Sequence, residues 1–195
     1  MGWHEELAWS VDIQLEESIL VWHVATHVYL SWYDETHSSR PDLAKAIQVF
    51  SNYMMFLLAA RPYMLPDNAS LQRYVELSNK VINYLKYSSA EHLVRLIREN
   101  GDRLNASGPS PLDSETRSQG DLTFDRASQL GAKLIIIKEL DAAADMLDLI
   151  SQVWMEMLCY VSYRCRAESH ARQLSDGGEI MTIVAILMEF KMMHL

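Results

Sequence analysis

Cysteine is scarce in this sequence, and Lys and Arg are absent near its N-terminus. Only two cysteines occur among 195 residues, and the first seventeen residues contain no Lys or Arg. Cys159 and Cys165 lie six positions apart in a segment that we expect to be one helix, which directs the two thiols to different faces. A disulfide scaffold is therefore excluded. Reduced cysteines and an N-terminal segment without basic residues predict a cytoplasmic protein that has no signal or transit peptide.

Basic residues are also outnumbered along the whole chain. Seventeen Lys and Arg face 26 Asp and Glu, which gives a net charge of −9. Nucleic acids and anionic membrane surfaces both attract cationic proteins, so this composition excludes them as partners. The acidic residues form no long run, which is typical of solvated helix faces rather than of a disordered acidic tail.

Apolar runs long enough to span a membrane are missing as well. The longest uncharged windows are residues 18–33 and 46–60, and both contain polar side chains. A membrane-spanning helix needs about 18 to 20 predominantly apolar residues. We therefore predict no membrane span and interpret both windows as buried core helices.

Strand-like alternation and internal repeats are absent, whereas apolar residues recur at spacings of three and four almost throughout. This pattern predicts an all-α fold: one domain over residues 1–195, built as an irregular bundle of six or seven helices. Pro41 suits the first turn of a helix, and Pro62 should end that helix at Arg61. The helices are expected at about 11–33, 41–60, 69–87, 88–100, 124–138, 141–167 and 180–193, the last of them buried.

One segment lacks the apolar residues that would anchor it. Residues 101–121 contain three Gly, two Pro and four Ser together with several charges. Such a composition is typical of a chain that cannot bury enough apolar surface to fix its conformation. We predict a long mobile loop here.

Recognisable catalytic motifs are missing too. His23 and His27 share one helical face at a spacing that metal sites use, but Val24 stands where a zinc protease has Glu, and no third ligand is apparent. Satisfied core histidines are the alternative interpretation. Cys159 with His170 matches no catalytic or zinc-ribbon spacing. The pair Glu16-Glu17 is interpreted as surface charge, because adjacent helical residues diverge by about 100 degrees. No metal and no cofactor is predicted.

Methionine and tryptophan, by contrast, are plentiful, with eleven and five copies. Thioethers adapt to irregular partners, and large planar side chains dominate interface cores, although both also fill protein cores. If they stay exposed, they form an interaction surface and the chain should be a homo-oligomer or part of a hetero-complex. The candidate surface consists of Trp3, Trp9, Trp32, Met188, Phe190, Met192 and Met193.

Several sequence blocks in order along the chain resemble a known family. They are residues 21–26 (VWHVAT), 51–58 (SNYMMFLL), 61–66 (RPYMLP), 154–160 (WMEMLCY), 169–175 (SHARQLS) and 177–179 (GGE). Together they resemble the C-terminal domain of plant proteins called domain of unknown function 594. In typical relatives this domain follows a membrane-spanning N-terminal region, so the resemblance implies a domain detached from that region.

The resemblance implies a shared structural pattern, for which a buried polar network is one interpretation, and no reaction. Where relatives commonly carry an acidic residue after the Thr of the first block, this chain has His27, so any role of that position is in doubt. The residues that carry the pattern are Trp22, His23, Thr26, Tyr53, Arg61, Pro62, Glu156, Cys159, His170, Gly177, Gly178 and Glu179.

Three hypotheses on function follow. The leading one is a non-enzymatic helical module that binds other proteins, either a family member or a second copy of itself. The second is a stand-alone interfering or growth-toxic protein that acts by binding a partner, as in toxin–antidote pairs. The third is a metal-dependent enzyme that uses His23, His27, Cys159 or His170.

Overall fold

The computed structural model describes residues 7–36, 39–66, 119–140, 145–175 and 179–192. Every regular element in these ranges is a helix, which confirms the all-α prediction. They are the 3-10 helices η1 (Ala8–Ser10) and η2 (Pro62–Met64) and the α-helices α2 (Leu15–Thr36), α3 (Pro41–Ala60), α6 (Gln119–Leu140), α7 (Met146–Arg164), α8 (Ala167–Ser175) and α9 (Ile180–Met192). The helices expected at 69–87 and 88–100 and most of the expected loop, residues 101–118, lie outside the described residues.

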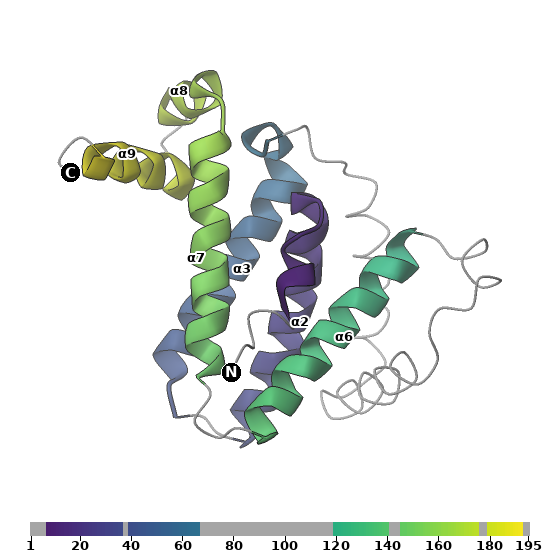
Figure 1. Cartoon of the computed structure of the whole chain (residues 1–195). Coiled ribbons are helices and arrows are strands. Elements are labelled where there is room, and N and C mark those ends of the chain that lie inside the picture. Colours follow the sequence, from purple (N-terminus) through teal and green to yellow (C-terminus); the bar gives the residue numbers. More distant parts are fainter. Residues whose placement is uncertain (1–6, 37–38, 67–118, 141–144, 176–178, 193–195) are drawn as a thin grey trace.

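The long helices follow one another in space in an order that differs from their order in the chain. Helix α2 packs against both α6 and α3, α3 packs against α7, and α7 packs against α9 (Figure 1). Helix α8 bridges η2 and α9 at one end of the bundle. Helix α9 leaves this end and points away from α7, with the C-terminus at its far end (Figure 1).

The core is centred on two tryptophans, each with no more than 1% of its surface exposed. Trp22 donates its indole N–H to Ser10 Oγ at 3.1 Å, and Ser10 in turn donates to the carbonyl of Leu7. Trp154 of α7 donates to Thr26 Oγ1 of α2, also at 3.1 Å. A buried indole N–H without an acceptor would be costly, so these hydroxyls let large aromatic groups fill the core.

Helix boundaries agree best with the prediction where proline defines them. Helix α3 begins at Pro41 and ends at Ala60, before Pro62. Helix α2 begins four residues later than predicted, because residues 11–13 form a turn and bends after η1. Helix α6 begins at residue 119 rather than 124, so the predicted loop is wrong for residues 119–121.

The helix predicted over 141–167 is shorter than expected and is followed by another. Helix α7 ends at Arg164, because Cys165 adopts an extended conformation with φ −63° and ψ 145°. The chain then enters α8, which the sequence analysis did not foresee. Both cysteines are free thiols.

Ion pairs add specific links between helices. Arg40 at the start of α3 contacts both Asp145 and Asp148 at the start of α7, at 2.6 and 2.9 Å. On the other side of the bundle, Arg126 of α6 lies 2.5 Å from Glu17 of α2. Glu17 is 5% exposed, so its interpretation as surface charge is wrong: α6 covers this position and supplies the cation that a buried carboxylate needs.

Helix α3 is the one described helix that is long and apolar enough to cross a membrane by length and composition. A third of its most apolar window is buried inside the bundle. One such helix is weak evidence for a membrane span, and α3 packs against α2 and α7. The interpretation of residues 46–60 as a buried core helix is wrong, because only one face of α3 is buried.

Candidate functional site

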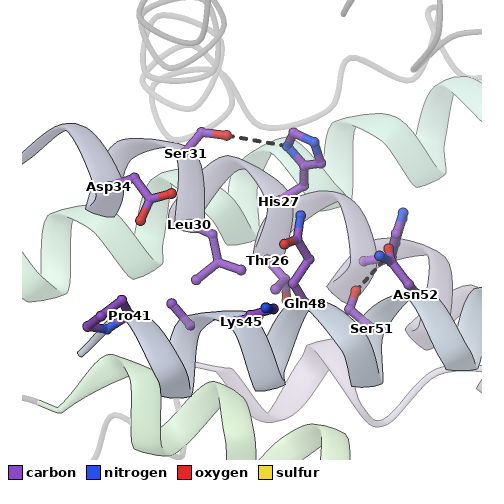
Figure 2. Close-up of a pocket in the computed structure, with 12 residues that line it drawn as sticks. Thr26, His27, Leu30, Ser31, Asp34, Pro41, Lys45, Gln48, Ser51 and Asn52 are labelled. Carbon is purple, nitrogen blue, oxygen red and sulfur yellow. Dashed lines mark hydrogen bonds between the residues drawn. The ribbon is translucent and has the colours of Figure 1, made fainter. Parts of the chain in front are cut away.

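A cavity of about 230 Å³ lies between α2 and α3. It is lined by His23 and His27, the two histidines whose spacing suggested a metal site. In Figure 2 it is flanked by Thr26, His27, Leu30, Ser31 and Asp34 of α2 and by Pro41, Lys45, Gln48, Ser51 and Asn52 of α3. The side chains are mixed in charge and mostly polar. Such a lining suits water or a small polar solute better than an apolar ligand.

His23 is the more buried of the two histidines and shares a hydrogen bond of 2.8 Å with Ser51 across the helix pair. Burial, together with the neighbouring His27, lowers the pKa of His23 to about 4, although the bond to Ser51 opposes this shift. The imidazole is therefore neutral at neutral pH. His27 is exposed, and its Nδ1 lies 3.5 Å from Ser31 Oγ.

The arrangement of these side chains offers no ready metal centre. Among the described residues, no three His, Cys, Asp or Glu side chains lie close enough together to hold a metal ion. His23 and His27 do share a face of α2, as their spacing predicts. Cys159 is half-buried on α7, and His170 lies on α8 among other partners.

Four residues of the family pattern, Tyr53, Arg61, His170 and Glu179, converge at a second place, where α3, α7, α8 and α9 meet. Tyr53 of α3 donates its hydroxyl hydrogen to Glu179 Oε2 at 3.2 Å and accepts the backbone N–H of Met181 at 3.2 Å. The second contact satisfies a backbone donor in the first turn of α9, which has no partner inside the helix. Burial, with a contribution from the Glu179 carboxylate, raises the pKa of Tyr53 to about 12, so the hydroxyl stays protonated.

Tyr63, next to Pro62 in η2, extends this cluster toward α8. Its hydroxyl accepts hydrogen bonds from Arg61 at 3.3 Å and from the side chain of Gln173, and its carbonyl accepts one from Ser169 at 3.2 Å. The guanidinium of Arg172 lies 5.0 Å from the centre of its ring. Arg61 also lies 4.0 Å from Glu179.

His170 completes the cluster by joining three helices. Its Nε2 donates to the carbonyl of Ser162 on α7 at 3.1 Å, because a carbonyl oxygen can only accept. Nδ1 therefore accepts the hydroxyl hydrogen of Thr182 on α9, at 3.0 Å, when the ring is neutral. We call the contacts of Tyr53, Arg61, Tyr63, His170 and Glu179 the C-terminal joint.

The remaining pattern residues lie elsewhere. Trp22 and Thr26 belong to the core, Glu156 is exposed and accepts a hydrogen bond from Gln152, and Cys159 is half-buried on α7. Gly177 and Gly178 lie outside the described residues. Sequence reasoning missed Tyr63, Ser169, Gln173 and Thr182, although three of them fall inside or beside the family-like blocks.

The expected interaction surface is only partly where it was predicted. Trp9 and Trp32 are partly buried against the core, and Met188 is partly buried on α9. Phe190 is exposed. Trp3 and Met193 lie outside the described residues, and only the backbone of Met192, at the end of α9, is described.

Helix α9 is not enclosed, which contradicts the prediction of a buried final helix. Met181 and Thr182 face the bundle, whereas five large apolar side chains are 46% to 61% exposed. They are Ile180, Ile183, Ile186, Leu187 and Phe190, and we call them the α9 face. The prediction failed because α9 is apolar around most of its circumference, while among the described helices only α7 and α8 make substantial contacts with it.

The α9 face, together with His170 and Glu179 of the joint, falls within a stretch of sequence that matches a known family, whereas Tyr53, Arg61 and Tyr63 lie outside it. Residues 139–193 match the family described as "Protein of unknown function, DUF594". This confirms the resemblance over that stretch. Comparison with curated proteins and with solved structures gave no match.

Proposed function

We propose that this chain, whose residues 139–193 match the DUF594 family, is a helical protein-interaction module that binds a protein partner through the α9 face. The observation that carries the proposal is the exposure of five large apolar side chains within eleven residues of one helix. Among the described residues no other helix exposes as many. Contiguous apolar surface of this kind is typical of interaction sites.

The C-terminal joint supports this role because it fixes the direction of α9. Tyr53, Glu179 and His170 connect the first turn of α9 to α3, α7 and α8 through side-chain hydrogen bonds. A helix held at its root presents its outer face in one orientation, which lowers the entropy lost on binding. The proposal assigns the surface a binding role and no reaction.

The composition of the surface favours a protein over other partners. None of the five side chains of the α9 face is charged, and the chain as a whole carries a net charge of −9. A nucleic acid or an anionic lipid surface would need cationic groups there. An apolar helix face instead suits the hydrophobic centre of a protein interface.

A matched pair of charge substitutions tests the proposal. Ile183→Glu places a carboxylate in the α9 face, and Val49→Glu makes nearly the same change on α3, where Val49 is 54% exposed against 56% for Ile183. Affinity capture with the full chain should recover the same proteins with the wild type and with Val49→Glu. Ile183→Glu should lose them, because a buried unpaired charge is costly at an interface centre. Equal recovery by both variants would reject the α9 face.

A further inference from the structure

The α9 face contains a stripe whose spacing is the same in both directions along the helix. Ile180, Ile183, Leu187 and Phe190 are separated by three, four and three residues. Spacings of three and four place side chains along the seam by which two helices pack. Reversing the helix leaves the pattern unchanged, so the stripe is complementary to an antiparallel copy of itself.

We infer that the partner of the α9 face is a second copy of this chain, bound so that the two α9 helices pack antiparallel about a two-fold axis. This inference rests on the function proposed above and names its partner. The axis crosses the stripe between Ile183 and Leu187, halfway along it. Ile180 then lies opposite Phe190 of the second copy, and Ile183 lies opposite Leu187. Each copy uses the same patch, as a two-fold interface requires.

The placement of α9 in the molecule favours the antiparallel direction. Its N-terminal end is attached to the bundle by the joint, and its other end points away from α7 (Figure 1). In an antiparallel pair the two bundles lie at opposite ends of a helix pair about 20 Å long. In a parallel pair they lie side by side, where the net charge of −9 on each would repel the other.

The exposed apolar area of the α9 face is large enough to form a weak dimer. Each of the five side chains exposes about half of its area, so each copy offers roughly 500 Å² of apolar surface and the pair buries roughly 1,000 Å². That is near the lower limit for a specific interface. It predicts a dimer that dissociates in the micromolar range and that tightens as salt screens the repulsion between two acidic chains.

Sedimentation of the purified full chain tests the dimer. The wild type and Val49→Glu should sediment as dimers at about 100 µM, and Ile183→Glu should raise the dissociation constant by roughly a hundredfold or more. Circular dichroism should show the same helix content in all three. A monomeric wild type at that concentration overturns the inference. A dimer that both variants weaken equally also overturns it.

Disulfide trapping tests the direction. In the antiparallel pair, mixing the chain carrying Ile183→Cys with the chain carrying Leu187→Cys should link position 183 to position 187 in preference to either position with itself. Mass spectrometry of the linked peptides separates these products from any linkage of Cys159 or Cys165. Preferential linkage of like positions would overturn the antiparallel arrangement. If the chain is monomeric but Ile183→Glu still abolishes capture of other proteins, the dimer fails while the proposed function stands.

Discussion

Helices α2 and α9 look alike in sequence but are covered very differently. Both contain a long stretch without charge, residues 18–33 in α2 and 180–188 in α9. In α2 this stretch is almost wholly buried, because α3 and α6 pack on it and Trp154 of α7 bonds to Thr26. In α9 half of the circumference remains exposed. An apolar sequence therefore shows only that a helix should be covered by other protein surface. The other helices of the chain decide whether that surface comes from the same molecule.

The two helices also differ in how polar groups are used. Around α2, hydroxyls of Ser10 and Thr26 satisfy buried indole N–H groups, so polar contacts serve the core. At α9, the polar contacts that the structure describes gather at the N-terminal root, in the joint. Polar contacts around α2 thus stabilise the core, whereas those at α9 hold the start of the helix.

The largest effect that tests this comparison is expected from an Ile→Ala substitution made once in each helix. Ile19 in α2 is fully buried and Ile183 in α9 is 56% exposed. Ile19→Ala should lower the free energy of unfolding by about 3 to 4 kcal/mol, through lost burial and a new cavity. Ile183→Ala should change it by less than about 0.5 kcal/mol, since alanine favours helix and little buried surface is lost. Urea denaturation followed by circular dichroism measures both.

Protein concentration is the control in that experiment. Denaturation is measured at the lowest practical concentration, where the chain is expected to be monomeric, and repeated at higher concentration. A similar loss from both substitutions in the dilute sample would show that α9 is as well covered as α2. The contrast between the two helices would then be wrong.

Acid should weaken the packing of α2 on α3 through His23. Its pKa falls from 6.5 in the unfolded chain to about 4 in the folded protein, mainly because of burial. Between these values the unfolded chain binds more protons, so stability is complete above about pH 6.5 and falls as the pH approaches 4. From the pKa difference, the loss is at most about 3 kcal/mol.

His23→Gln removes this titration while keeping a polar group beside Ser51. The wild type and the variant should differ in how the free energy of unfolding changes between pH 7 and pH 4, with the steeper decline in the wild type. Urea denaturation at several pH values gives both curves. Parallel curves would show that His23 is protonated as easily in the folded protein as in the unfolded chain.

Sequence reasoning succeeded where one residue decides a local structure. Pro41 and Pro62 marked the limits of α3, because proline suits a first turn and restricts the residue before it. Helix α8 was missed because it is short and mostly polar, with Leu174 as its one large apolar residue. Its single buried residue, Gln173, bonds to Tyr63, which is 110 positions away in the chain.

The residues of the candidate site also divide into those that the sequence indicated and those that it did not. Resemblance to a family singled out Tyr53, Arg61, His170 and Glu179 without saying what they contact, and the structure shows that they meet at the joint. Of the α9 face, Phe190 belonged to the predicted interaction surface, and the other four residues were missed because hydropathy does not record which side of a helix has a neighbour. The three-four-three spacing of its stripe was present in the sequence, but a buried helix has the same spacing.

The smallest effect should come from loosening α9 without disturbing the bundle. Tyr53→Phe removes the hydroxyl that bonds to Glu179 and to the backbone N–H of Met181. The ring remains and continues to pack against the core, so the global free energy of unfolding should fall by only about 1 kcal/mol. Hydrogen exchange should quicken in the first turns of α9 and stay unchanged in α2. Tyr160→Phe, which makes the same change on an exposed tyrosine of α7 beside Val11 and Ile13, serves as the control and should leave exchange in α9 as it is. Equal protection of α9 in Tyr53→Phe and wild type would mean that packing on α7 alone holds the helix, and that the joint does not fix its direction.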